Sequence, residues 1–235
     1  MSLEINNGFL CRYYDDGRSV LTIPHGVKAM GIGVFKSCRN LKKVIIPETV
    51  ISVSAFAFAD CTELESVEIP ESVETIGISA FDGTPFYEND KRDFVIYGKA
   101  LYRYNGSGTD IRIPDGVVSV TNSAFEGNTM IRRIVMPDSV KHIGNSAFKN
   151  CENLALVTLS ENTVRICDSA FENCKSLESL IIPDDVVAIG DFAFKGCRNL
   201  RNIKLPAGLC FIGDQVFYGC VFLSDLKIPE SANQI

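Results

Sequence analysis

The sequence lacks the features that most enzymes, membrane proteins and nucleotide-binding proteins need. It has no tryptophan and only 2 histidines, His25 and His142, which a 23-residue repeat would place about five stacked coils apart, too far to share a metal ion or relay a proton. No run reaches the length of about 18 apolar residues that a membrane-spanning helix needs. No glycine pattern typical of a dinucleotide-binding turn or a phosphate loop occurs. The sequence therefore predicts no catalytic residue, no metal site, no cofactor and no membrane span.

Positive charge is also scarce. Lysine and arginine number 23 against 29 acidic residues, which gives a net charge of −6. General nucleic-acid binding needs a strongly basic face, so the sequence predicts no nucleic-acid partner. The 9 cysteines contain no C-x-x-C metal spacing. The N-terminus has no charged segment followed by an apolar stretch, so no secretory signal peptide is recognised in this chain.

What the sequence does have is a repeat. One phenylalanine recurs every 23 residues, with one longer gap of 44 residues between Phe81 and Phe125. The residue before it is always small, either Ala or Val. A fixed period of this length is typical of a solenoid, in which stacked coils bury apolar columns that no coil could bury alone. The members of the column are Phe35, Phe58, Phe81, Phe125, Phe148, Phe171, Phe194 and Phe217.

The unit at residues 174–196 shows what one coil contains. Leu180 and Ile182 alternate with polar or exposable neighbours, as in a half-buried strand that Pro183 ends. A second short extended segment follows at residues 186–189. Residues 191–196 have the length and composition of one helical turn, with Asp191 as its candidate N-cap. Each coil is therefore predicted to be strand, turn, short strand and helical turn.

Six cysteines occupy one repeat position, three residues after the phenylalanine. A cysteine in an inward column behaves as a small buried hydrophobe. Neighbouring coils would bring two of them within disulfide distance, but with their side chains parallel rather than facing each other. We therefore expect free buried thiols rather than disulfides. The column comprises Cys38, Cys61, Cys151, Cys174, Cys197 and Cys220.

The repeat follows the pattern L-x-x-V-x-I-P-x-x-V-x-x-I-G-x-x-A-F-x-x-C over nearly the whole chain. This pattern resembles the 23-residue bacterial type of leucine-rich repeat, the BspA-like family. The resemblance implies a right-handed leucine-rich-repeat superhelix, mostly β, with short parallel strands in two layers and short helical turns. It also implies a binding or adhesion module at the cell surface or in secreted proteins, although a cytoplasmic location stays open. No catalytic residue carries over from the family.

The same pattern predicts the domain organisation. Residues 1–18 precede the first clean repeat and are expected to form an N-terminal cap, since a solenoid has an open edge. Residues 19–235 are expected to form a single solenoid of about nine coils. A hairpin-like insert at residues 84–108 is rich in aromatic side chains, with strands predicted on either side of Gly98-Lys99. These side chains could form a stacking platform for a sugar or peptide, but a miniature core under the hairpin is favoured.

The predicted binding site is the outward face of the first strand of each coil. There the strands fix the positions of the side chains while their identity varies from coil to coil, as a recognition surface requires. Apolar residues beside arginines are typical of interface hot spots, although strand propensity alone also explains exposed Ile and Val. The candidate binding residues are Ile45, Arg132, Arg133, Val135, Leu156, Thr158, Ile181, Arg201 and Lys204.

The function predicted from these features is a non-enzymatic interaction or adhesion module that binds a protein or glycan. Two alternatives remain, a carbohydrate-active β-solenoid enzyme using carboxylates on the same face and a purely structural spacer. A row of acids after the Ile-Pro positions, which includes Glu161, could bind calcium, but a solvent-facing turn is the favoured explanation. Apolar Val221 and Phe222 stand in the last coil where other coils have polar residues, which indicates a truncated repeat array or, as the less favoured alternative, an end-to-end contact with another molecule.

Overall fold

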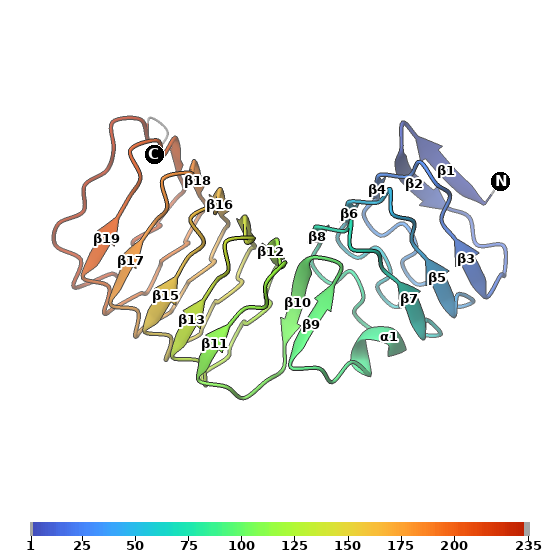
Figure 1. Ribbon diagram of the computed structural model, residues 1–235, viewed down its shortest axis with the longest axis horizontal. Helices are drawn as coiled ribbons and strands as arrows, with labels where there is room; N and C mark the ends of the chain where they lie inside the picture. Colours follow the sequence, from blue (N-terminus) through green and yellow to red (C-terminus); the bar gives the residue numbers. More distant parts are fainter. Residues whose placement is uncertain (1, 233–235) are drawn as a thin grey trace. The chain divides into compact units, whose positions relative to one another are not determined.

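Short strands recur at the same two places in each repeat of the computed structural model, which describes residues 2–232 (Figure 1). The contacts divide the chain into two compact units, Met1–Tyr102 (unit 1) and Arg103–Ile235 (unit 2). Each unit has a first and a second layer of short strands, and the strands of successive coils are stacked in parallel. The fold class expected from the repeat is therefore confirmed. That residues 19–235 form one domain stays a prediction.

In unit 1 the first-layer strands form one sheet in the order β3-β5-β7. They are β3 (Val20–Thr22), β5 (Lys43–Ile45) and β7 (Ser66–Glu68). The second layer has the order β1-β2-β4-β6-β8. Its members are β1 (Leu3–Asn6), β2 (Phe9–Tyr13), β4 (Ala29–Met30), β6 (Ser52–Val53) and β8 (Thr75–Ile76).

The segment predicted to cap the solenoid folds as an antiparallel hairpin of β1 and β2, and β2 then pairs in parallel with β4. The insert contains one short helix, α1 (Pro85–Glu88), which the sequence analysis did not predict. The two strands expected around Gly98-Lys99 are β9 (Phe94–Tyr97) and β10 (Ala100–Tyr104), which are hydrogen-bonded neighbours. The N–H of Lys99 donates to the carbonyl of Val73 at 2.7 Å, which attaches the hairpin turn to unit 1.

In unit 2 the first-layer strands form two sheets, in the orders β11-β13-β15 and β17-β19. They are β11 (Asp110–Arg112), β13 (Arg133–Val135), β15 (Leu156–Thr158), β17 (Ser179–Ile181) and β19 (Asn202–Lys204). The second layer runs β12-β14-β16-β18-β20 without interruption. Its strands are β12 (Ser119–Val120), β14 (His142–Ile143), β16 (Arg165–Ile166), β18 (Ala188–Ile189) and β20 (Phe211–Ile212).

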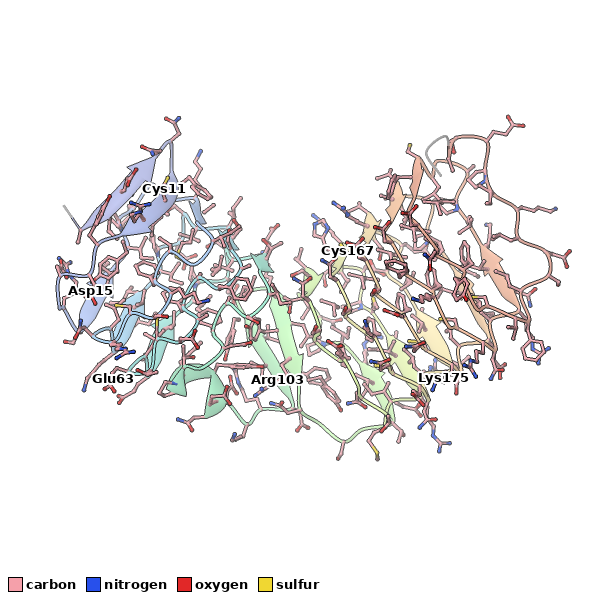
Figure 2. All side chains as sticks on the ribbon, turned by 180° about the vertical axis from the view of Figure 1, so that it is seen from behind. Cys11, Asp15, Glu63, Arg103, Cys167 and Lys175 are labelled. Carbon is pink, nitrogen blue, oxygen red and sulfur yellow. The ribbon has the colours of Figure 1, made fainter. Side chains whose placement is uncertain are left out.

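The core of each unit is a stack of the repeated phenylalanines. In unit 1, Phe35, Phe58 and Phe81 lie parallel, with ring centroids 4.9 and 5.4 Å apart. In unit 2, successive rings from Phe125 to Phe217 are 4.9–5.9 Å apart and within 16° of parallel. Figure 2 shows the side chains between the strand layers of each unit. The period of 23 residues is thus realised as a column of rings, as predicted.

A tyrosine begins each stack. Tyr13, in β2, packs on Phe35 with ring centroids 5.1 Å apart, and Tyr104, at the end of β10, packs on Phe125 at 5.2 Å. Both tyrosines stand three residues after a leucine in the second strand of a hairpin. The two hairpins therefore have the same role, which is to cover the first phenylalanine of a unit.

The segment around each phenylalanine is not the helical turn that the sequence analysis predicted. It is a run of reverse turns in which the residues two before and two after the phenylalanine are left-handed, for example Ser146 (φ 56) and Asn150 (φ 59) around Phe148. In the unit chosen to predict a helix, these positions are Phe192 (φ 58) and Gly196 (φ 74). A left-handed residue cannot continue a right-handed helical turn.

The run of turns instead directs backbone groups toward the next coil. The N–H of Phe148 donates to the carbonyl of Ala170 at 2.8 Å, and that of Phe171 donates to Ala193 at 2.8 Å. Asp191 is not an N-cap of its own coil, because its carboxylate accepts from the N–H of Asp214, one coil on, at 2.8 Å. The equivalent side-chain oxygens bridge other coils of unit 2 in the same way. Asn122 accepts from the N–H of Asn145, Asn145 from that of Asp168, and Asp168 from that of Asp191.

We predict that Phe171→Ala lowers the free energy of unfolding by about 3–5 kcal/mol, since the ring is fully buried between two others and its loss leaves a cavity. Urea denaturation measures the change. Tyr218→Ala is the matched control, because that ring is 66% exposed and its loss should cost less than about 1 kcal/mol. Equal losses for the two variants would contradict the assignment of the ring column as the core.

Candidate interaction surface on the strand face of unit 2

The outward side chains of the first-layer strands form a lattice fixed by the parallel register. Arg133 on β13 is the partner of Leu156 on β15, and Val135 is the partner of Thr158. The middle residue of β13, Ile134, points inward and is fully buried. Alternation along a strand therefore places residues 133 and 135, and their counterparts in other coils, on one exposed face.

Four of the predicted binding residues line one groove of about 460 Å³ on this face. Arg133, Leu156, Thr158 and Ile181 contribute side chains to it, together with Glu161. Leu156 is 53% exposed and Ile181 67% exposed, which is unusual for large aliphatic side chains in a folded chain. An apolar floor with a few charges at its edges is typical of a binding surface.

A second groove of about 450 Å³ shares Thr158 and Glu161 with the first. Val135, another predicted residue, lines it beside Asp138 and Arg112. The two grooves therefore form a continuous surface over β11, β13, β15 and β17. Arg133 lies at the edge of this surface where the strands begin. The carboxylates of Asp115, Asp138 and Glu161 lie at the opposite edge, beyond the ends of the strands.

The other predicted residues lie around this surface or in the other unit. Arg132 is exposed next to Arg133, and Lys204 is exposed on β19. The guanidinium of Arg201 lies over the ring of Phe222, 5.0 Å from its centroid. Ile45 is half-buried on β5 of unit 1, so it is not assigned to the grooves of unit 2.

Glu161, one of the row of acids after the Ile-Pro positions, was not among the predicted binding residues, yet it lines both grooves. No group of three or more His, Cys, Asp or Glu side chains within residues 2–232 is arranged to hold a metal ion. The end-to-end contact through the last coil stays a prediction, and Val221 and Phe222 are exposed there at 70% and 51%.

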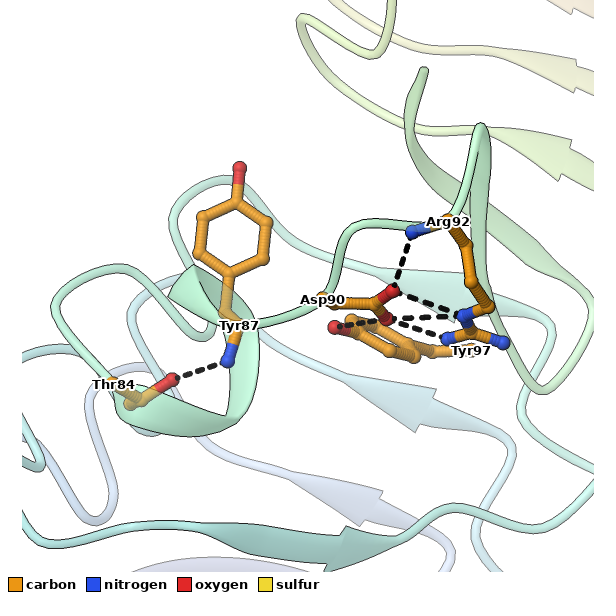
Figure 3. Close-up of polar contacts among 5 residues, drawn as sticks. All are labelled: Thr84, Tyr87, Asp90, Arg92 and Tyr97. Carbon is orange, nitrogen blue, oxygen red and sulfur yellow. Dashed lines mark hydrogen bonds and ion pairs between the residues drawn. The ribbon is translucent and has the colours of Figure 1, made fainter. Parts of the chain in front are cut away.

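The aromatic insert is built as a miniature core, the interpretation that the sequence favoured over a stacking platform. Tyr97 and Tyr102 are buried, and both rings meet Phe81 edge-on at 5.3 and 5.7 Å. Figure 3 shows Asp90 between Arg92 and Tyr97, accepting a hydrogen bond from the Tyr97 hydroxyl at 3.3 Å. The Arg92 guanidinium donates to Asp90 and lowers the pKa of that carboxyl.

The same figure shows why α1 begins at Pro85. The Thr84 hydroxyl accepts from the N–H of Tyr87 at 3.2 Å, an N-cap followed by proline at the first helical position (Figure 3). The Thr84 hydroxyl also donates to the carbonyl of Phe81 at 2.6 Å. Thr84 stands three residues after Phe81, the position that cysteine occupies in six other coils. The insert therefore begins where a threonine replaces a cysteine of the column.

The cysteine column consists of free, buried thiols, as predicted. The Cys38 thiol donates to the Asp15 carboxylate at 3.5 Å, and each of the other five donates to the carbonyl of the phenylalanine in the preceding coil, for example Cys174 to Phe148 at 3.2 Å. The Phe148 carbonyl also accepts from the N–H of Cys151, so the thiol of Cys174 supplies the second hydrogen bond to this carbonyl. Outside the column, Cys167 is half-buried next to the end of β16 (Figure 2) and Cys210 is exposed.

Burial makes these column thiols poor nucleophiles. It raises the pKa of Cys61 and of Cys151 to about 12 and that of Cys220 to about 11, and it also raises the pKa of Cys174. A reactive cysteine needs a lowered pKa and exposure. The column therefore serves the stacking of coils rather than chemistry.

These features define a leucine-rich-repeat solenoid whose strand face carries grooves. The family described as "BspA type Leucine rich repeat region (6 copies)" matches residues 12–129, 95–186 and 164–235. The chain belongs to this family. No curated protein matches the chain. No helix among the described residues has the length and apolar character required to traverse a bilayer.

Solved structures of bacterial leucine-rich-repeat proteins are similar to the chain. A leucine rich cell surface protein from Faecalibacterium prausnitzii A2-165 has 29% identity and a TM-score of 0.57 over 88% of this chain and 58% of that one. A leucine-rich repeat protein from Bacteroides ovatus ATCC 8483 has 28% identity and a TM-score of 0.50 over 95% of this chain and 54% of that one. The chain thus spans little more than half the length of each. The pneumococcal vaccine antigen PcpA, at 18% identity, a TM-score of 0.50 and 92% and 62% coverage of the two chains, shares the fold.

We predict that the free energy of unfolding falls as the pH rises from about 8.5 to 10. An unfolded thiol ionises with a pKa near 8.5, whereas the buried thiols stay protonated to about pH 11–12. A group whose pKa is raised in the folded state stabilises the fold fully below the unfolded pKa and loses that contribution above it. Each thiol should therefore contribute a loss of up to about 1.4 kcal/mol per pH unit.

Denaturation at a series of pH values checks this expectation. The variant Cys174→Ala should show a smaller loss between pH 8.5 and 10 than the unchanged protein. Cys210→Ala is the control, because its side chain is exposed, and the loss should stay as in the unchanged protein. The same pH dependence in both variants would refute the role given to the column.

Proposed function

We propose that the chain is a non-enzymatic interaction module of a surface or secreted protein, and that it binds a protein partner through the grooves on the strand face of unit 2. The observation that carries this proposal is the groove of about 460 Å³ in which Arg133 and Glu161 flank the exposed side chains of Leu156 and Ile181. Arginine is enriched at interface hot spots, and an exposed apolar patch with a polar rim marks an interaction site.

The family and its solved relatives support the cellular setting. The chain belongs to the BspA-type leucine-rich repeats, and one relative at 29% identity is described as a cell surface protein. A module displayed at the cell surface is in contact with other extracellular proteins, which favours a protein as its partner. The two grooves share lining residues and extend over several neighbouring strands, which suits a protein partner.

The carboxylates on this face favour binding over glycoside hydrolysis. Hydrolysis needs a carboxylic acid whose pKa is raised in a dry pocket, so that it can donate a proton near neutral pH. Asp115, Asp138 and Glu161 are exposed instead. They are better suited to long-range attraction and to pairing with a basic partner residue.

The test begins with partners selected on the whole chain from a displayed library of extracellular protein domains. We predict that Arg133→Glu combined with Leu156→Asp weakens their binding at least about 30-fold, because it removes an arginine and an apolar anchor from the groove. Surface plasmon resonance measures the affinities.

The control variant carries Arg165→Glu and Val187→Asp in the second layer of unit 2. Val187 is 52% exposed and Leu156 53%, so the two variants change similar amounts of exposed apolar surface and the same charge. The control should bind within about threefold of the unchanged chain. If the control loses binding and the groove variant keeps it, the strand face is not the binding surface.

A further inference from the structure

The parallel hydrogen bonding of the first layer is interrupted once in unit 2. The N–H of Met136 donates to the carbonyl of Thr158 at 2.9 Å, and that of Ile182 donates to Lys204 at 3.0 Å. The equivalent bond from Leu159 to Ile181 does not occur within residues 2–232. Accordingly β15 ends one sheet and β17 begins the next, although the two strands are neighbours.

The interruption opens the larger groove between β15 and β17. Val157, Leu159 and Leu180, which belong to inward positions, line it together with the outward residues. Val157 is half-buried, whereas the equivalent residue of the preceding coil, Ile134, is fully buried. The N–H of Leu159 and the carbonyl of Ile181 are therefore not bonded to each other across the interruption, although the two strands stay in contact.

Two departures from the repeat stand at this coil. Ser160 replaces the usual proline, and Thr163 replaces the usual valine. The Ser160 hydroxyl donates to the carbonyl of Asp138 in the preceding coil at 3.1 Å, and the Asn162 amide donates to the same carbonyl at 2.9 Å. Both bonds hold the turn against the coil before it, on the side away from β17.

These departures reduce stability. The Thr163 hydroxyl is buried without a hydrogen-bond partner, an arrangement that costs about 1–3 kcal/mol relative to a methyl group. Natural sequences break their own pattern mostly where function requires it. The loss of the proline and of the valine coincides with the opened groove.

We propose that the groove between β15 and β17 binds an extended peptide segment of the partner protein. This inference rests on the proposed function and specifies what the partner inserts. An apolar side chain of the segment packs between Leu156 and Ile181.

The charges at the two edges set the order of residues in the segment. Neither Arg133 nor Glu161 forms an ion pair with a described residue, so both are available to a ligand. Arg133 receives a carboxylate at the end where the strands start, and Glu161 receives a lysine or arginine beyond the strand ends. Leu156, the partner of Arg133, and Glu161 are five positions apart, a span of at most about 16 Å, so the acid and the base are about three to five residues apart.

The experiment selects binders to the whole chain from a phage-displayed library of random nine-residue peptides. We expect enriched peptides with an acidic residue, a central apolar residue and a basic residue at this spacing. A parallel selection on Glu161→Lys should replace the basic residue by an acidic one and leave the other two positions unchanged. Enrichment without this pattern, no enrichment, or an unchanged pattern on Glu161→Lys overturns the proposal.

A second variant closes the groove by restoring the repeat. Ser160→Pro combined with Thr163→Val should raise the midpoint of urea denaturation and weaken binding of a selected peptide at least about 30-fold. Ile181→Asp, at a side chain 67% exposed, should weaken it similarly, and the control Val187→Asp should not.

The outcomes separate the two proposals. If a partner domain loses binding with Arg133→Glu and Leu156→Asp but binds the restored variant as tightly as the unchanged chain, the groove inference fails and the proposed function stands. If neither variant affects the partner domain, both fail. Retained peptide binding by a restored variant that is more stable also overturns the groove inference.

Discussion

The backbone hydrogen bonds between successive coils are the constraint on which the rest of the structure depends. A single coil has no partner for most of its N–H and C=O groups, and buried groups of this kind must be paired. The parallel strands satisfy them in two layers, and the reverse turns around each phenylalanine satisfy them in a third place, as in the bond from Phe148 to Ala170. This constraint explains the period of 23 residues, since only an exact repeat keeps all three sets of hydrogen bonds, in the two strand layers and in the turns, in register.

The repeat allowed much of the fold to be predicted, because inward columns repeat residue types. The phenylalanine stack, the buried free thiols and the hairpin of Phe94–Tyr97 and Ala100–Tyr104 were all anticipated. The left-handed residues of the turns were not, because serine, asparagine and phenylalanine occupy them as well as glycine. The bridging Asn and Asp side chains were also missed, although their recurrence 23 residues apart was visible.

The candidate site was predictable only in part for a related reason. Alternation along a strand identifies outward side chains such as Leu156 and Ile181, but it cannot tell which pairs of strands are hydrogen-bonded. The interruption beside β15 depends on contacts between coils. Its trace in the sequence is the polar pair Ser160 and Thr163 at positions that are otherwise apolar. Stability is lowered locally, beside the groove that we propose as the binding site.

Amide hydrogen exchange resolved by residue tests this account most directly. The amide of Leu159 should exchange at least about tenfold faster than those of Met136 and Ile182, the equivalent amides in the neighbouring coils, because theirs alone are bonded to the next coil. Equal protection of the three amides would mean that the strands are paired without interruption, and it would contradict the account.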